Sequence, residues 1–191
     1  MKVFEHKRIT RIFLDTEFTS LTQEAQLLSL ALVAETGEKF YAEFNDYNPD
    51  RITEWVQANV VDHFEMNDVE ASVRLEGNTL KYKSDTTEAL VYLKKWLNKF
   101  DNIQMWADVP HYDWVLFCEL FDGSMNLPEN LHFMCLDLAT LLTVKGYNPD
   151  VSRISLLCED EIPKNYKIHN ALSDAEVGMI ILKKINGNKI V

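Results

Sequence analysis

Short apolar blocks separated by turn residues begin the chain and predict three strands. Residues 11–17 carry the β-forming run Ile12-Phe13-Leu14, and residues 39–44 alternate loosely between apolar and polar side chains. Residues 27–34 are almost continuously apolar, a pattern that is typical of a strand buried on both faces. Because the turn residues 35–38 separate the last two blocks, we expect these two strands to pair as a hairpin.

Helical spacing dominates the rest of the chain, where apolar residues recur every three or four positions. Thr86 and Asp137 are candidate helix caps in front of two of these runs. The polar segment 72–83 contains Gly77-Asn78, which is a turn signal. Helices are predicted over residues 52–64, 86–100, 112–121, 138–144 and 170–185, and two more strands over residues 103–107 and 131–136.

This order of elements predicts an α/β fold. An antiparallel meander comes first and α/β crossovers follow, which favours a mixed sheet of five to six strands with helices on both faces. Apolar residues make up 47% of the chain and charged residues 26%, so the chain can bury a proper core. Since glycine and proline are few and scattered, no linker divides the sequence, and residues 1–191 are expected to form a single domain.

Charge and targeting signals narrow the class of function. The net charge of −11 argues against a protein that coats long nucleic acid, but it is compatible with an enzyme that takes one strand end into a small site. The longest apolar run is too short to cross a bilayer, and the first residues lack a signal-peptide pattern. The three cysteines match neither a zinc site nor a disulfide framework. We therefore expect a cytoplasmic protein that makes no membrane contact.

Two carboxylates, Asp15 and Glu17, directly follow the apolar run of the first strand. Side chains two residues apart in a strand point to the same face, and carboxylates on one face can share a hard cation such as Mg²⁺. A strand that simply ends in solvent has the same pattern. However, the ends of buried strands are also where α/β folds place their sites.

Further polar residues stand at the starts of two predicted helices. His169 precedes the last helix and Asp174 lies in its first turn, while Asp113 lies in the first turn of the helix that follows strand 103–107. Asp108, at the end of that strand, is the alternative to Asp113. A carboxylate in a first turn also complements the helix dipole, so each residue alone has a structural explanation. Their combination with the first pair of carboxylates favours a functional site.

Taken in order, these three motifs resemble those of the DEDDh 3′–5′ exonucleases, a family of the ribonuclease-H-like superfamily. The first family motif, Asp-x-Glu after a strand, corresponds to Asp15-Thr16-Glu17, and the second, an aromatic residue and Asp at a helix start, corresponds to Tyr112-Asp113. The third, His and Asp with four residues between them, corresponds to His169 and Asp174. Within the family, the sequence looks most like a small stand-alone exoribonuclease branch whose mycobacterial member prefers adenylate-rich RNA. Pro110, just before the second motif, departs from the family's pattern.

The resemblance implies a ribonuclease-H-like sheet and two-metal hydrolysis of phosphodiester bonds at the 3′ end of single-stranded nucleic acid. It implies RNA as the first substrate, nucleoside 5′-monophosphates as products, and two Mg²⁺ ions that Mn²⁺ can replace. His169 is the expected general base for the attacking water. The implied metal ligands, which are also catalytic residues, are Asp15, Glu17, Asp113 and Asp174. The residues expected to contact the substrate are Phe18, Thr19 and Tyr112, with Phe18 packed on the terminal nucleotide.

Several alternatives stay open at this point. Single-stranded DNA is the second candidate substrate. A catalytically silent nucleic-acid-binding module on the same fold is disfavoured because all four carboxylates and the histidine are present. A proofreading subunit that works with a polymerase is a third interpretation. The resemblance also implies a homodimer.

Overall fold

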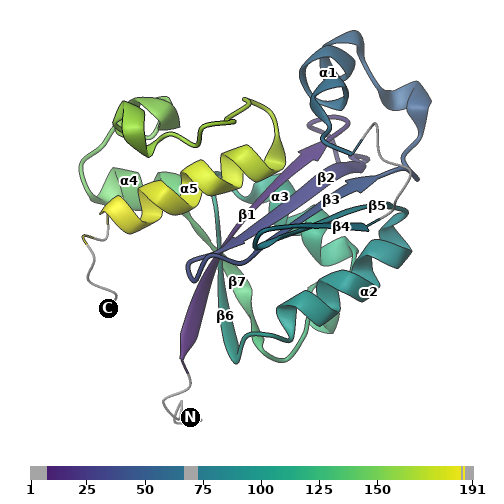
Figure 1. The fold of residues 1–191 in the computed structure, drawn as a ribbon, viewed down its shortest axis with the longest axis horizontal. Helices are drawn as coiled ribbons and strands as arrows, with labels where there is room; N and C mark the ends of the chain where they lie inside the picture. The colour runs from purple at the N-terminus through teal and green to yellow at the C-terminus, as the bar shows by residue number, and fades with distance from the viewer. Residues whose placement is uncertain (1–7, 67–72, 186, 188–191) are drawn as a thin grey trace.

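One mixed β-sheet forms the centre of the protein (Figure 1). The computed structural model describes residues 8–66, 73–185 and 187, and within them the sheet has seven strands in the order β4-β5-β3-β2-β1-β6-β7. The strands are β1 (Ile9–Phe18), β2 (Leu27–Ala34), β3 (Lys39–Phe44), β4 (Val73–Glu76), β5 (Thr79–Ser84), β6 (Asn102–Ala107) and β7 (Leu131–Asp137). The α/β class predicted from the sequence is therefore confirmed.

Strand β1 lies inside this sheet and pairs on both sides. It is antiparallel to β2 and parallel to β6, and β2 is antiparallel to β3, as the hairpin pattern predicts. The pairing with β6 ends at Phe13 opposite Trp106, whereas the pairing with β2 continues to Phe18 opposite Leu27. Residues 15–18 of β1 therefore extend past the end of the pairing with β6, and one edge of this segment has no neighbouring strand among the described residues.

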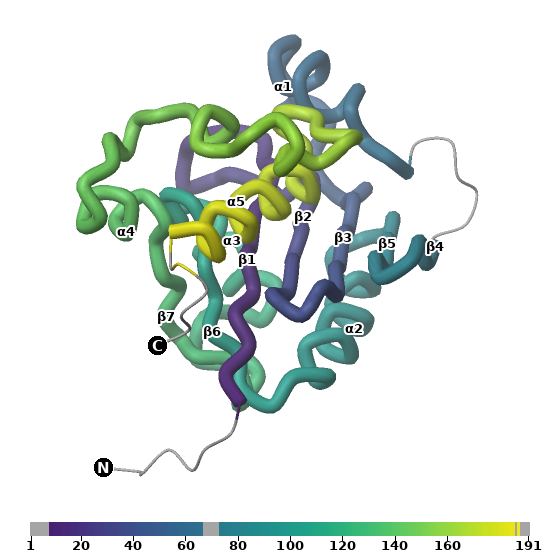
Figure 2. Tube along the Cα trace, turned by 60° about the vertical axis from the view of Figure 1, so that its left-hand side comes forward, coloured from purple at the N-terminus to yellow at the C-terminus, as the bar shows by residue number. Residues whose placement is uncertain are grey.

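Helices cover both faces of the sheet (Figures 1 and 2). The helices are α1 (Glu54–Asn59), α2 (Thr86–Leu97), α3 (His111–Glu119), α4 (Leu138–Val144) and α5 (Ala171–Ile185). Helices α2 and α3 bury their apolar side chains against one face, together with Ile12 and Leu14 of β1. Helices α4 and α5 pack against the other face, together with Phe13 of β1 and Tyr41 of β3. Successive residues of β1 thus alternate between the two layers, as the geometry of a strand requires.

Helix α5 approaches the sheet unusually closely at Gly178. A Cβ atom built at this position would lie 2.2 Å from Cε1 of Phe13, well inside van der Waals contact. The absence of a side chain at Gly178 therefore lets the helix rest directly on the ring of Phe13. This contact lies one helical turn beyond Asp174, so it helps to set how near the start of α5 comes to β1.

Two segments differ from their predicted structure. The sheet has seven strands rather than five or six, because the polar segment predicted as a turn forms the hairpin of β4 and β5; its first residue, Ser72, lies outside the described residues. Polar residues suit this hairpin because it lies at the sheet edge, where the ammonium of Lys81 pairs with Glu76 at 2.6 Å. The helix predicted over residues 52–64 ends at Asn59, where two β-branched residues, Val60 and Val61, follow.

Candidate functional site

Three carboxylates from two distant parts of the chain meet where β1 passes the start of α5. Asp15 and Glu17 lie on the α5 face of β1, and Asp174 lies in the first turn of α5. Each of the three offers one oxygen atom, and these oxygens lie within 4.8 Å of one another. The structure thus brings together three of the four carboxylates that the sequence motifs single out. All three are partly buried.

Asp174 is held by the loop that precedes its helix. Its Oδ1 accepts a hydrogen bond from the hydroxyl of Tyr166 at 3.0 Å, and its Oδ2 accepts one from the backbone N–H of His169, also at 3.0 Å. His169 has a φ of 59°, in the left-handed region that costs energy for a residue with a Cβ. Because the backbone of His169 is held in this conformation, the position of its Cα atom next to the carboxylates is fixed.

The ring of His169 also contacts helix α1. The indole of Trp55 meets the imidazole edge to face, with ring centroids 5.1 Å apart. The side chain of Trp55 is 56% exposed, so it covers the histidine from the solvent side and is not part of the core. Helix α1 therefore forms one wall of the site.

Asp113, from helix α3, binds the edge of β1 at Thr16 and is not one of the three carboxylates whose oxygens lie within 4.8 Å of one another. Its Oδ1 accepts hydrogen bonds from the backbone N–H of Thr16 at 2.9 Å and from the hydroxyl of Thr16 at 2.7 Å. The backbone group of Thr16 belongs to the part of β1 that has no neighbour after β6 ends, so the carboxylate replaces a strand as its acceptor. Asp113 is therefore fixed to the same strand residues that carry Asp15 and Glu17, without belonging to the cluster.

The alternative carboxylate, Asp108, is occupied by an ion pair. Arg153 donates from Nε to Oδ2 at 2.6 Å and from Nη2 to Oδ1 at 2.8 Å, a two-pronged geometry that arginine forms well with carboxylates. The next residue, Val109, has a φ of 52°, and its N–H donates to Oδ1 of Asp137 at 3.1 Å. The turn containing Pro110 is thus strained but held at two points, and it delivers Asp113 to β1.

Burial raises the pKa values of all four acids. Desolvation is the largest cause for each, and neighbouring carboxylates add to it for Asp15 and Glu17. The pKa of Asp15 lies well above its ordinary range, and that of Glu17 is raised to about 8. For Asp174 and Asp113, hydrogen bonds from Tyr166 and Thr16 oppose the rise in pKa. Such a cluster is electrostatically strained as long as no positive charge enters it.

Of the three residues expected to contact a substrate, Phe18 and Thr19 follow the first motif and Tyr112 belongs to the second. Phe18 stacks on Tyr112 with ring centroids 5.5 Å apart, and the hydroxyl of Tyr112 donates to the carbonyl of Leu21 at 2.8 Å. Thr19 is buried, and its hydroxyl oxygen accepts the N–H of Gln26 at 3.1 Å. This pairing closes the loop between β1 and β2.

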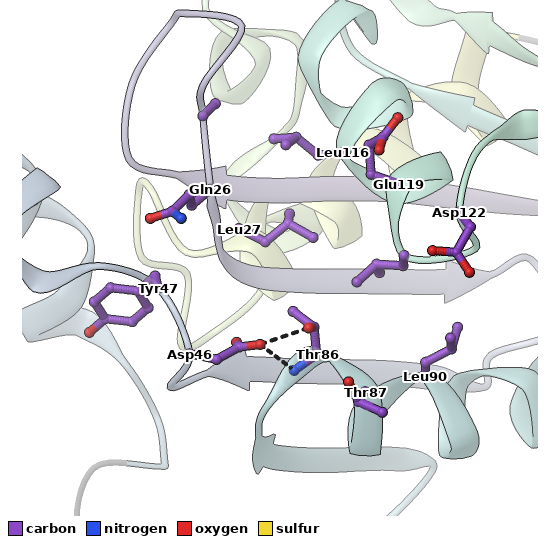
Figure 3. A pocket seen from close by; sticks show the side chains of 12 residues that line it. Gln26, Leu27, Asp46, Tyr47, Thr86, Thr87, Leu90, Leu116, Glu119 and Asp122 are labelled. Carbon is purple, nitrogen blue, oxygen red and sulfur yellow. Dashed lines mark hydrogen bonds between the residues drawn. The ribbon is translucent and has the colours of Figure 1, made fainter.

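A pocket of about 460 Å³ opens next to this loop, between the start of β2 and helices α2 and α3 (Figure 3). Leucine side chains such as Leu27 and Leu90 line it together with the carboxylates of Asp46, Glu119 and Asp122. Of the described residues, those that line this pocket include none of the candidate site residues. Its carboxylates repel phosphate groups, so the pocket is poorly suited to the backbone of a nucleic acid.

Comparison with known proteins shows the family of this chain. The sequence model of the family described as "3′-5′ exoribonuclease Rv2179c-like domain" matches residues 10–186. The chain belongs to this family. It is also 27% identical over 165 residues to two proteins of Mycobacterium tuberculosis, a match that covers 86% of this chain and 86% of each relative. They are named 3′-5′ exoribonuclease MT2234.1 (strain CDC 1551 / Oshkosh) and 3′-5′ exoribonuclease Rv2179c (strain ATCC 25618 / H37Rv).

In this Rv2179c-like domain, the side chains that hold the motif carboxylates in place are harder to identify from the sequence than the carboxylates themselves. Tyr166 reaches Asp174 only through the path of the preceding loop, and Arg153 reaches Asp108 from a segment far along the chain. Thr16 stands inside the first motif, yet its role appears only when the end of β6 is known. In the described part of the chain, no helix combines the length and the apolar character needed to cross a bilayer.

Proposed function

We propose that this member of the Rv2179c-like family is a metal-dependent 3′–5′ exoribonuclease of the DEDDh type with a ribonuclease-H-like fold. The observation that carries the proposal is the meeting of Asp15, Glu17 and Asp174 beside His169, with their oxygens within 4.8 Å of one another. The family match and the names of the two mycobacterial relatives support the same activity. The substrate is the 3′ end of single-stranded RNA, and the products are nucleoside 5′-monophosphates.

The donor set fits hard divalent cations. It consists of carboxylate oxygens, the ligands that Mg²⁺ prefers, and Mn²⁺ takes the same ligands. The raised pKa of each acid has the sign expected for a cluster whose negative charge a cation would balance. Asp15, Glu17 and Asp174 would hold one ion, and Asp113 would support a second. Two bound cations would supply Lewis-acid activation of the attacking water and neutralise charge on the departing oxygen.

His169 acts as the general base in this proposal. An imidazole exchanges a proton near neutral pH, and it can take one from the water that attacks the terminal phosphorus. The new P–O bond forms as the bond to the 3′ oxygen of the preceding nucleotide breaks, and that oxygen takes up a proton from solvent. Two contacts orient the imidazole before the reaction begins: the backbone N–H of His169 binds Asp174, and the indole of Trp55 meets the ring. The entropy of ordering the base is therefore not lost during the chemical step.

Tyr166 and Thr16 keep the carboxylates in place. Each donates its hydroxyl to one oxygen atom, Tyr166 to Oδ1 of Asp174 and Thr16 to Oδ1 of Asp113. These bonds restrict the rotation of the two carboxylates before any cation arrives. Reduced rotation lowers the entropy lost when the ligands are ordered around an ion.

The acidic protein must bind RNA without a large basic surface. Base stacking on aromatic side chains is worth about 1–3 kcal/mol per base, and the stacked pair of Phe18 and Tyr112 lies next to the first motif. We assign the terminal base to this pair, whereas Thr19, which is buried, supports the loop behind it and does not contact the substrate. A single strand end needs few phosphate contacts, which is consistent with a net charge of −11.

The decisive experiment uses 5′-labelled single strands of the same sequence, one of RNA and one of DNA. Each is incubated with Mg²⁺, Mn²⁺ or a chelator and resolved on a sequencing gel, with chromatography of the released mononucleotides. A metal-dependent ladder that shortens from the 3′ end of RNA supports the proposal, and faster cleavage of DNA would reassign the substrate. The variant Asp15→Asn should abolish the ladder, whereas Asp122→Asn, in the pocket of Figure 3, is the matched control. If neither strand is cut, the protein is a silent binding module.

A further inference from the structure

A chain of buried polar side chains runs beneath the start of α5. Glu43 and Tyr41 of β3 are both 0% exposed, and Asn170, the residue before α5, is 2% exposed. Glu43 and Tyr41 are two residues apart, so they point to the same face of the sheet, the face that α5 covers. Burying a carboxylate and an amide is costly unless they are hydrogen-bonded, so these contacts need an explanation.

In the hydrogen bonds that link these three side chains, the donor and the acceptor can be assigned. The hydroxyl of Tyr41 donates its single proton to Oε1 of Glu43 at 2.9 Å. Oε1 of Glu43 also accepts the backbone N–H of Met66 at 3.1 Å, which identifies this oxygen as an acceptor. The phenol oxygen of Tyr41 can then only accept from Asn170, whose Nδ2 lies 3.5 Å away.

This assignment favours one orientation of the amide of Asn170. With its Nδ2 facing Tyr41, its Oδ1 faces α5 and accepts the backbone N–H of Ser173 at 3.1 Å, as a helix cap does. If the amide turned over, its oxygen would face the phenol oxygen, and its N–H group would face the N–H of Ser173. The N–H of Ser173 and the phenol oxygen that Glu43 orients therefore favour the same orientation of Asn170, and Tyr41 adds a second contact that holds it.

Asn170 is joined directly to His169, whose backbone is in the left-handed conformation. A strained residue of this kind persists only when its surroundings determine its conformation. On one side, the N–H of His169 is bonded to Asp174; on the other, Asn170 is bonded to the cap of α5 and to the sheet. The three buried polar side chains thus connect strand β3 to the proposed general base.

Packing alone does not account for the hydroxyl of Tyr41. The neighbouring residues Phe40 and Phe44 of the same strand are fully or almost fully buried rings that carry no hydroxyl. A phenylalanine at position 41 would fill nearly the same volume among the apolar side chains of α5. The hydroxyl is the part of Tyr41 that contacts Glu43 and Asn170, so these two hydrogen bonds are what a tyrosine adds at this position.

We propose that Tyr41, oriented by Glu43, is a positioning residue that holds His169 in place through Asn170. This inference rests on the proposed exoribonuclease activity for its kinetic consequence only. Tyr41 acts on the orientation of the base and makes no contact with the three-carboxylate cluster. Its loss should therefore slow the chemical step while leaving the affinities for RNA and for the cation nearly unchanged.

The test compares Tyr41→Phe with the wild-type protein on 5′-labelled RNA. We expect kcat to fall by about tenfold with KM changed by less than about twofold, because a small misplacement of a catalytic group slows the reaction without weakening binding. The matched control is Tyr82→Phe, which removes a hydroxyl from another fully buried tyrosine, in the β5 strand next to β3. That ring faces α2, on the other side of the sheet, so kcat should not change.

A second variant keeps the helix cap at position 170 and removes only the hydrogen bond to Tyr41. In Asn170→Ser, the hydroxyl oxygen can still accept the N–H of Ser173 as a helix cap, but the shorter side chain does not reach the hydroxyl of Tyr41. We expect the same loss of kcat as in Tyr41→Phe, and no further loss in the double variant, because both remove one link. Additive losses would show that the two residues act independently and would overturn the proposal.

Amide hydrogen exchange gives a readout that does not depend on activity. In Tyr41→Phe, the backbone amides of His169 and Ser173 should exchange faster than in the wild type, whereas in Tyr82→Phe they should not. Unchanged exchange at these amides, or an unchanged kcat, contradicts the positioning role. If the wild-type protein fails to shorten RNA, the proposed function is wrong, and the exchange rates alone decide whether Tyr41 orders His169.

Discussion

The indole of Trp55 contacts the imidazole of His169 edge to face, at a centroid distance of 5.1 Å. This contact joins a short helix that carries an exposed tryptophan to the residue assigned as the general base. An edge-to-face pair adds about 0.5–1.5 kcal/mol beyond the area it buries, which is enough to favour one orientation of the ring. The wall of the site is thus built from a part of the chain that contributes no carboxylate to it.

Replacing Trp55 should therefore affect turnover more than stability. In Trp55→Ala, we expect kcat on RNA to fall about three- to tenfold, since His169 loses one of the contacts that orient it. The free energy of unfolding should change by less than about 1 kcal/mol, because more than half of the side chain is already exposed. Trp55→Phe keeps an aromatic edge and should recover most of the rate. An unchanged kcat in the alanine variant would remove Trp55 from the site.

The acidic cluster predicts how stability depends on pH in the metal-free protein. Burial and the carboxylates of Asp174 and Asp113 raise the pKa of Glu17 to about 8, from an ordinary value of 4.5. Between these values the folded protein keeps a proton that the unfolded chain releases. The free energy of unfolding should therefore fall as the pH rises from about 5 to 8, by about 2–4 kcal/mol from this group.

Thermal unfolding in the presence of a chelator measures this effect. The variant Glu17→Gln should flatten the dependence on pH and should melt at a higher temperature than the wild type at pH 8. Added Mg²⁺ should stabilise the wild-type protein more at pH 8 than at pH 5, because protons compete with the cation for the same oxygens. A melting temperature that rises with pH in the metal-free protein would contradict the electrostatic description of the site.

Two substitutions at Asp113 separate its structural role from its proposed metal role. Asp113→Asn keeps an oxygen that can accept both bonds from Thr16, whereas Asp113→Ala leaves these buried donors without their acceptor. We expect the alanine variant to lose about 1–3 kcal/mol of stability and the asparagine variant to lose much less. Both should lose most of their RNA cleavage, because neither carries the charge. A fully active asparagine variant would show that Asp113 serves only to hold β1.

A side chain at Gly178 should disturb both stability and activity. In Gly178→Ala, the new methyl group would meet the ring of Phe13, so α5 must move away from β1. We expect a loss of about 1–3 kcal/mol and a lower kcat, since Asp174 moves with the helix. The second substitution Phe13→Leu, which makes room, should recover part of both. Equal losses in the single and double variants would mean that this contact does not set the position of α5.

Much of the fold is predictable because hydrophobic spacing identifies its strands and helices. The run Ile12-Phe13-Leu14 predicts β1, and the cap of α4 by Asp137 is confirmed by bonds from the N–H groups of Ala139 and Thr140. The hairpin of β4 and β5 escapes prediction because an edge strand can be polar. Lys81 pairs with Glu76 across this hairpin but also with Glu65, which precedes it, and spacing along the sequence cannot reveal the second partner.

The candidate site divides in the same way. Strand periodicity predicts that Asp15 and Glu17 share a face, and their convergence with Asp174 is consistent with the order of the motifs. In contrast, the position of Asp113 at the edge of β1 depends on where β6 ends, which is a property of strand pairing. The buried link from Glu43 to Asn170 depends on which strand lies under α5, and no local pattern contains this information.

The first strand of the sheet and the last helix of the described fold share the acidic cluster. During synthesis, a ribosome completes β1, β2 and β3 long before it reaches His169 and Asp174. A growing chain that ends before His169 therefore has two of the clustered carboxylates and neither the third nor the histidine. Its apolar surface around Phe13 and Tyr41 also waits for the same helix. An enzyme that degrades RNA thus has no complete site until the ribosome has read the messenger beyond the codon for Asp174.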